Sequence, residues 1–143
     1  MILLDANLLV YAYAPGSPRH RPAREWLESV LTASPKVGLP WPSLLAFVRL
    51  IGNPRVVQNP APLSRSWSRV QQWLALPHVW IPLPTDRHEQ VITGLLAGES
   101  RVDLANDAHL AALAIEHGLT LCSADRDFAR FPGLRWENPL EGE

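Results

Sequence analysis

Apolar residues along the chain follow two different spacings, and the two alternate from the first residues onward. Short, nearly continuous apolar runs are typical of buried parallel strands, while apolar residues three and four positions apart are typical of helices with one buried face. On this basis we predict strands in residues 1–5, 36–40, 78–84, 119–124 and 134–140. We predict helices in residues 7–16, 17–34, 42–54, 63–76, 85–98 and 107–117.

Strands that alternate with helices indicate right-handed βαβ crossovers. We therefore predict an α/β fold: one domain over residues 1–143, with a central, mainly parallel β-sheet flanked by helices on both faces. The segment at 134–140 is expected at an edge of the sheet. Ser17, and Thr85 or Asp86, are expected to cap the helices that follow them.

Composition narrows the class of protein without assigning a function. A chain of 143 residues, 47% hydrophobic and 19% charged, is ordinary for one globular domain. Its single cysteine, Cys122, cannot form an internal disulfide, which suits a reducing compartment. No apolar run approaches the roughly 20 residues of a membrane span, and Asp5 interrupts the apolar start, which makes a signal peptide a poor interpretation. We expect a cytoplasmic protein.

Three carboxylates stand where strands end or helices begin. Asp5 ends the first predicted strand, Asp125 follows the strand at 119–124, and Asp107 opens the helix at 107–117. Sites in open parallel sheets form beyond the carboxyl ends of the strands, so these acids are expected to converge. Oxygen-only ligands suit Mg²⁺, with Mn²⁺ as a substitute, and the natural chemistry of such a site is metal-assisted hydrolysis of a phosphodiester.

Each acid also has a purely structural interpretation. Asp107 can be a first-turn residue favoured by the helix dipole, and Asp125 and Asp127 can shape a turn through hydrogen bonds to the backbone. Asp5 is harder to explain in this way, because an acid between apolar segments is costly to bury without a partner. Asn7, two residues on, can hold its carboxylate or a metal-bound water.

Several segments resemble a known family. Residues 3–9 (LLDANLL), 107–118 (DAHLAALAIEHG) and 121–140 (LCSADRDFARFPGLRWENPL) are similar to the PIN-domain ribonucleases, specifically the VapC toxins of bacterial toxin–antitoxin pairs. Residues 19–29 and 47–56 are also similar, so that the resemblance covers nearly the whole chain.

The resemblance implies roles for individual residues. The family's first acid corresponds to Asp5, its helix acid to Asp107, and the first acid of its T-x-D-x-D-F motif to Asp125. Asp127 matches the second acid of that motif and is expected to act through water, while Ser123 replaces the usual threonine and keeps a hydroxyl. The resemblance further implies an Mg²⁺-dependent endoribonuclease acting on RNA, a cognate VapB-like antitoxin and a homodimer.

One departure from the family concerns a glutamate. Most members carry it on the helix at 42–54, in an E-x-x-R setting whose arginine is Arg49; the position is Ala46 here, and residues 29–85 contain no Asp or Glu. We expect a metal site that is weaker or holds more water. Asp103, one helical turn before Asp107, is a candidate for compensation, with a loop or cap role as the alternative.

The acid-free segment and its neighbours suggest further contacts. Lys36 and four arginines lie within the acid-free segment. This segment has two interpretations: an ordinary neutral surface, or a positively charged surface that faces a phosphodiester backbone. Arg19, Arg21 and Arg49 are candidates for RNA contact, against the alternative of a solvated face. We expect His109 to have a packing role rather than the role of a general base. We expect Trp67 and Trp73 to lie in a core, or in a groove that binds a second copy or the antitoxin, rather than to stack on bases.

Two rival functions remain open at this point. One is a catalytically silent PIN-fold binding protein, because the family's second carboxylate is absent. The other is an aspartyl-phosphate phosphotransferase with Asp5 as nucleophile, but that chemistry usually needs a second acid where Asn7 stands.

Overall fold

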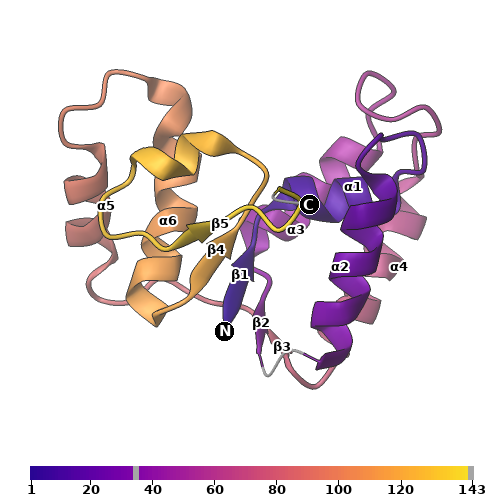
Figure 1. The fold of residues 1–143 in the computed structure, drawn as a ribbon, viewed down its shortest axis with the longest axis horizontal. Helices are drawn as coiled ribbons and strands as arrows, with labels where there is room; N and C mark the ends of the chain where they lie inside the picture. Colours follow the sequence, from indigo (N-terminus) through magenta and orange to yellow (C-terminus); the bar gives the residue numbers. More distant parts are fainter. Residues whose placement is uncertain (34–35, 142–143) are drawn as a thin grey trace.

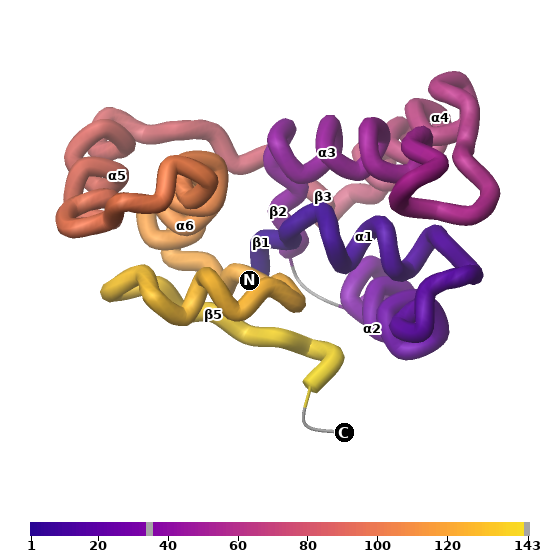
Figure 2. Tube along the Cα trace, turned by 90° about the horizontal axis from the view of Figure 1, so that it is seen from above, coloured from indigo at the N-terminus to yellow at the C-terminus, as the bar shows by residue number. Residues whose placement is uncertain are grey.

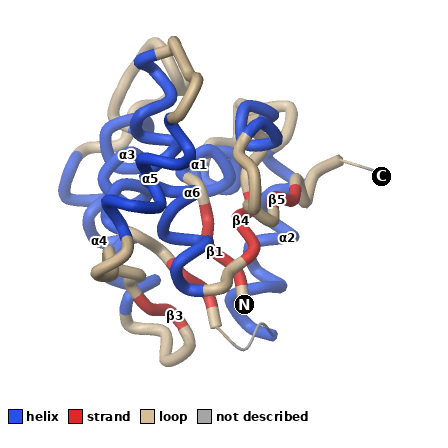
Figure 3. Tube along the Cα trace, turned by 90° about the vertical axis from the view of Figure 1, so that its left-hand side faces the viewer, coloured by secondary structure: helices blue, strands red, loops and turns tan. Residues whose placement is uncertain are grey.

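The computed structural model describes residues 1–33 and 36–141. At its centre lies a sheet with the strand order β3-β2-β1-β4-β5, in which every pairing is parallel. The strands are β1 (Ile2–Leu4), β2 (Val37–Gly38), β3 (Val79–Trp80), β4 (Thr120–Cys122) and β5 (Trp136–Glu137). Figure 3 shows how short these strands are beside the helices around them. The predicted parallel sheet is confirmed, and β5 lies at its edge as expected.

The sheet carries a helical layer on each face, as predicted. One layer contains α1 (Ala6–Tyr13), α2 (His20–Ala33), α3 (Trp41–Ile51) and α4 (Leu63–Leu74), and the other contains α5 (His88–Leu96) and α6 (Ala105–His117). Figures 1 and 2 show the two layers on opposite sides of the strands. Successive strand residues point to opposite faces, so Leu3 packs in the α5–α6 core and Leu4 in the α1–α4 core.

Bulky side chains fill the α1–α4 core. Phe47 is fully buried and lies between Tyr13 and Trp73. Its ring centre is 5.7 Å from that of Tyr13, with 83° between the ring planes, and 4.8 Å from that of Trp73, with 56° between the planes. Aromatic pairs in these tilted and edge-on arrangements are favourable beyond the area that they bury. The amphipathic spacing that predicted α4 is explained by Val70 and Trp73, which face this core.

The α5–α6 core contains more small residues, four of them alanines of α6. The middle of α6 is buried at consecutive positions, including Ala111, Ala112 and Ala114, so this part of the helix is surrounded on nearly all sides. Gly118 then adopts a left-handed conformation, with φ 66°, which ends α6 and turns the chain directly into β4.

Some local details differ from the predictions. Two short 3₁₀ helices, η1 (Val102–Leu104) and η2 (Arg126–Arg130), were not predicted. The residue before α5 is Arg87, which makes no side-chain cap, so neither Thr85 nor Asp86 caps this helix as predicted. The Thr85 hydroxyl instead accepts from the N–H of Arg87 (3.2 Å) and donates to Glu116 in α6 (2.6 Å). Helix α2 begins at His20, after a turn in which Ser17 Oγ accepts from the backbone N–H of Arg19 (3.1 Å). The predicted end of this helix at residue 34 lies outside the described residues.

No helix in the described ranges combines the length and the apolar character needed to cross a bilayer. Cys122 is buried in β4, and burial raises the pKa of its thiol to about 12.

Candidate metal centre

The acids gather at the carboxyl edge of the sheet. Asp5 directly follows β1 and caps α1, its Oδ1 accepting from the N–H of Ala6 at 2.8 Å. Asp125 follows the adjacent strand β4 and caps η2, accepting from the N–H of Asp127 at 2.9 Å. Because β1 and β4 are parallel neighbours, with Leu4 opposite Cys122, the two strands end side by side. The first turn of α6 brings Asp107 to the same edge.

Three of these acids form a compact group. Asp107, Asp125 and Asp127 each offer a carboxylate oxygen, and these oxygens all lie within 4.8 Å of one another. All three residues are partly buried. Asp5 lies outside this group of three but close enough for its charge to act on Asp107 and to be acted on by Asp125. Four carboxylates from three chain segments therefore share one edge of the sheet.

Ser123 links the Asp5 side of the site to the Asp125 side. Its fully buried hydroxyl donates to Asp5 Oδ2 at 2.8 Å and accepts from the backbone N–H of Asp125 at 3.0 Å. It also accepts from Asn7 Nδ2 at 3.1 Å, while Asn7 Oδ1 accepts from the N–H of Ala124 at 3.4 Å. A hydroxyl has one donor and two acceptor positions, and here all three are used. The side chains of Asn7 and Ser123 thus hold the two strand ends together.

The electrostatics of the site disfavour its charged state in the absence of a cation. Burial, followed by the charges of Asp125 and Asp5, raises the pKa of Asp107 to about 6. Burial also raises the pKa of Asp5, against the opposing effect of the hydrogen bonds from Ser123 and Ala6. Raised carboxyl pKa values are the expected result when like charges meet in a partly desolvated site. A divalent cation would relieve this repulsion.

Asp103 is close to the site but is paired elsewhere. It lies in η1, not in α6, and both of its oxygens accept from Arg101, at 3.2 and 2.6 Å. This guanidinium lowers the pKa of Asp103, whereas Asp103 contributes to the raised pKa of Asp107. Arg101 also contacts both oxygens of Asp127. Arg101 is not among the predicted site residues, although its position two residues before Asp103 is a local signal for such a pairing.

The other candidates lie away from the carboxylates. Arg21 pairs with Glu25 at 3.1 Å, the Arg19 guanidinium lies 5.4 Å from the Tyr11 ring centre, and Arg49 is exposed at the end of α3. Within residues 1–33 and 36–141, no hydrogen bond or ion pair joins these arginines to the acidic group. Ala46 lies in α3 and has no side chain able to bind a cation.

His109 faces α5 rather than the acids. Its Nδ1 lies 2.9 Å from His88 Nε2, and His88 Nδ1 lies 2.5 Å from Glu116 Oε2. Glu116 also accepts from the backbone N–H and the hydroxyl of Thr85. Burial and the nearby His88 lower the pKa of His109. This chain of polar contacts joins α5 to α6, which agrees with a packing role for His109.

The donor set fits a hard divalent cation. All the acidic ligands are oxygens, and the site includes neither a thiolate nor an imidazole among the described residues. Carboxylate-only sites are typical of Mg²⁺ and Mn²⁺, which retain waters and bind through a few carboxylates. The side chains that would hold the cation come from the segments after β1, at the start of α6 and after β4.

Comparisons with known proteins agree with this arrangement. The family model of the PIN domain matches residues 2–134. The chain is 41% identical to "Ribonuclease VapC37" of Mycobacterium tuberculosis over 97% of both chains, and 37% identical to "Ribonuclease VapC33" of the same organism over 98% of this chain and 99% of the relative.

A solved structure extends the agreement to the fold. The chain superposes on a chain of VapBC2 from Rickettsia felis, in a crystal structure with a DNA fragment from their promoter, with a TM-score of 0.68 and 21% identity, over 96% of this chain and 98% of that one. The chain therefore belongs to the PIN-domain family and, within it, is similar over nearly its whole length to the VapC ribonucleases.

Proposed function

We propose that this protein is the toxin of a type II toxin–antitoxin module and acts as an Mg²⁺-dependent endoribonuclease in the cytoplasm. The observation that carries the proposal is the meeting of Asp107, Asp125 and Asp127 within 4.8 Å, with Asp5 beside them. The similarity to proteins named ribonucleases over nearly the whole chain supports RNA as the substrate.

Each residue of the site has a defined task in this proposal. Asp5, Asp107 and Asp125 hold the cation directly, and Asp127 acts through water. A bound divalent cation stabilises charge that develops on the phosphate and makes a bound water a nucleophile at neutral pH. Ser123 and Asn7 orient Asp5 and the Asp125 loop through the hydrogen bonds described above. Precise orientation matters because hydrogen bonds to the side chains that hold a cation tune the affinity for that cation.

RNA cleavage tests the proposal directly. Purified protein, freed of any antitoxin, is incubated with total RNA and Mg²⁺, and new 5′ ends are mapped. We expect Mg²⁺-dependent cuts that EDTA abolishes and that Asp125→Asn reduces on the order of a thousandfold, because several kcal/mol of charge stabilisation are lost. Asp86→Asn is the matched control, since Asp86 is exposed in the turn before α5. Equal cleavage by wild type and Asp125→Asn would contradict the proposal.

A catalytically silent binding protein is the second candidate, and the alanine at position 46 favours it. If wild type and Asp125→Asn both leave RNA intact at saturating Mg²⁺ and Mn²⁺, the silent form is the better description. An aspartyl-phosphate enzyme is less compatible with the site, because both oxygens of Asp5 already accept hydrogen bonds and the Asn7 amide donates to Ser123. A covalent phosphate on Asp5 would restore that alternative.

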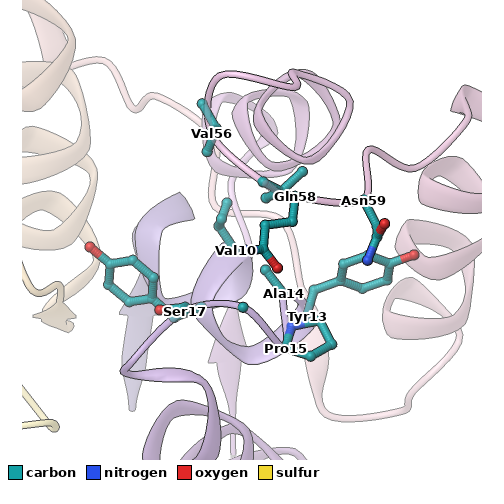
Figure 4. Close-up of a pocket in the computed structure, with 11 residues that line it drawn as sticks. Val10, Tyr13, Ala14, Pro15, Ser17, Val56, Gln58 and Asn59 are labelled. Atoms are coloured by element: carbon teal, nitrogen blue, oxygen red, sulfur yellow. The ribbon is translucent and has the colours of Figure 1, made fainter.

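We propose that a segment of the VapB-like antitoxin docks along α1. Two adjoining hollows, of about 380 and 350 Å³, share Tyr13 and Pro15 in their walls. The first is mostly apolar, and Figure 4 shows Val10, Ala14 and Pro15 facing Val56, Gln58 and Asn59 across it. The second lies between α1, α2 and α4 and is lined by apolar residues together with His20, Arg24, Glu28 and Arg69. Because Arg24 pairs with Glu28 at 3.1 Å, Arg69 supplies the net positive charge of this hollow. An apolar peptide with acidic residues fits this combination.

Charge reversal on α4 tests the docking surface. Arg69→Glu is expected to weaken binding of the antitoxin roughly tenfold or more, because the guanidinium at the second hollow is replaced by a like charge for the acidic peptide. Arg65→Glu is the control, since Arg65 is exposed on the same helix and does not line either hollow. Equal weakening by both variants would indicate a general charge effect and remove this surface from the proposal. The homodimer also remains a proposal, to be checked by sedimentation at increasing concentration.

A further inference from the structure

Arg101 donates hydrogen bonds to two different carboxylates at the site, Asp103 and Asp127. It directly precedes η1, which leads without a break into α6 and Asp107. Its guanidinium makes two forked contacts with carboxylates. Nε and Nη2 donate to the two oxygens of Asp103 at 3.2 and 2.6 Å, and Nη1 and Nη2 donate to the two oxygens of Asp127 at 3.2 and 3.1 Å. A planar guanidinium matches carboxylate geometry in this bidentate manner, which an ammonium group cannot do.

These contacts engage one of the carboxylates of the compact acidic group in which the cation would bind. Asp127 places an oxygen within 4.8 Å of the ligand oxygens of Asp107 and Asp125. Both oxygens of Asp127 accept from Arg101, and Arg130 approaches Oδ1 at 3.7 Å. A divalent cation that bound Asp127 directly would therefore have to displace a guanidinium. Arg101 also holds Asp103, the acid that could otherwise replace the missing glutamate on α3.

We propose that Arg101 is a positioning residue that competes with the divalent cation for Asp127 and so limits the direct ligands of the cation to Asp5, Asp107 and Asp125. This inference rests on the proposed function, because it assumes that the site binds a divalent cation. The guanidinium supplies positive charge on the Asp127 side of the acidic group and lowers the affinity of the site for the cation. Its side chain is 42% exposed, which leaves it room to move away when Asp127 is engaged.

Direct measurement of Mn²⁺ binding, without RNA, tests the proposal. Isothermal titration calorimetry and the electron paramagnetic resonance of free Mn²⁺ give the dissociation constant and the number of ions bound. We expect Arg101→Gln to bind Mn²⁺ on the order of tenfold more tightly than wild type, allowing for screening of an exposed charge by solvent and salt. Arg101→Lys retains the charge but loses the fork, and we expect a smaller gain.

Two controls separate competition at Asp127 from a general change in charge. Arg126→Gln removes the same charge from η2, but Arg126 is 81% exposed and pairs with Glu141 at 3.1 Å, so little change is expected. The Asp127→Asn variant provides the other control. In that background, Arg101→Gln should no longer increase the affinity, because Asp127 is absent and Asp103, the other released carboxylate, lies outside the compact group of three.

The outcomes are distinguishable from failure of the proposed function. Equal Mn²⁺ affinity in wild type and Arg101→Gln, or a gain that persists with Asp127→Asn or appears equally in Arg126→Gln, would overturn the role of Arg101 and leave the metal site standing. Absence of Mn²⁺ binding in every variant, with unchanged circular dichroism, would overturn the metal site and this inference together.

Discussion

The two helical layers on the sheet are built from different residues and carry different chemistry. The α1–α4 layer contains nearly the whole acid-free stretch 29–85, packs large aromatic side chains, and is hollowed on both sides of Tyr13. The α5–α6 layer is centred on an alanine-rich helix whose first turn carries an acid of the metal centre. One layer thus supplies bulky side chains and the two hollows, and the other supplies close packing and three of the four acids at the edge of the sheet.

The site forms where the two layers meet. Asp5 begins α1 in the first layer, while Asp107, Asp125 and Asp127 belong to the second. Ser123 joins the two groups through its three hydrogen bonds. Neither layer therefore holds the complete set of acids. The adjacent strands β1 and β4, at the centre of the sheet, bring the two parts together.

The largest expected effect on stability comes from emptying either core. Phe47→Ala in the α1–α4 layer should lower the free energy of unfolding by about 3–5 kcal/mol, because a fully buried ring is removed and a cavity remains. Leu113→Ala in the α5–α6 layer should cost about 2–5 kcal/mol for the same reason. Since both layers share one sheet, urea unfolding followed by circular dichroism should give a single transition for both variants. Separate transitions would mean that the layers unfold independently.

Ser123→Ala should have the next largest effect, and it breaks the link between the layers. The substitution leaves Asp5 Oδ2 and the amide of Asn7 without their partner, at about 1–3 kcal/mol of unfolding free energy. Ser66→Ala is a matched control in α4, because Ser66 is equally buried but donates only to Leu63 of its own helix, so a change within about 0.5 kcal/mol is expected. Similar losses in both variants would argue against a special role for Ser123.

The pH dependence of stability should distinguish the acidic edge from the rest of the molecule. The folded pKa of Asp107, about 6, lies above its ordinary value of 3.8. Protonated Asp107 therefore stabilises the folded protein at low pH. This contribution is lost as pH rises from about 4 through 6, and the free energy of unfolding falls by about 1 kcal/mol once the partial exposure of the side chain is discounted. Asp107→Asn should flatten this slope in metal-free protein, whereas Asp86→Asn should not. Thermal unfolding in EDTA across this range measures the slope, and an unchanged slope in Asp107→Asn would contradict the assignment.

The smallest expected effect on the free energy of unfolding comes from replacing two glycines of the α5–α6 layer by alanine. The change should have opposite signs at the two positions. Gly118→Ala should destabilise the protein by about 1 kcal/mol, because φ is 66° there. Gly94→Ala should stabilise it by about 0.5–1 kcal/mol, since Gly94 lies inside α5 and an added Cβ meets no atom within 4 Å. Urea midpoints measure both. Destabilisation by Gly94→Ala would show that α5 does not tolerate a side chain at that position.

Much of the fold could be predicted from the chain because its local signals agree with each other. Apolar runs and helical spacing located the strands and the long helices, and their alternation indicated a parallel sheet. The 3₁₀ helices η1 and η2 were not predicted, because segments of three to five residues have no repeating apolar pattern. The Thr85 cap was wrong because α5 begins at His88, so the Thr85 hydroxyl accepts from the N–H of Arg87, ahead of the helix. Its bond to Glu116 of α6 is a tertiary contact that no local pattern reveals.

Candidate residues of the site could be named from the sequence, whereas the contacts between them could not. Acids at strand ends and at a helix start stand out in any parallel α/β pattern, so Asp5, Asp107 and Asp125 could be proposed together. The pairing of Asp103 with Arg101 is local, since the two residues are two positions apart. The pairing of Asp127 with Arg101 could not be foreseen, because η1 and η2 approach each other only in the folded chain. The same holds for the contact of His88 with His109 and Glu116 across two helices.

The sequence by itself determined where strands and helices form, which faces are apolar, and which acids stand at the ends of those elements, because these properties depend on neighbouring residues. The tertiary structure decided that β1 and β4 lie side by side, that Ser123 joins Asp5 to the Asp125 loop, and that Arg101 reaches Asp127. Contacts of this kind depend on the packing of two layers against one sheet, and the distances between carboxylates that set pKa values and cation affinity exist only after that packing is complete.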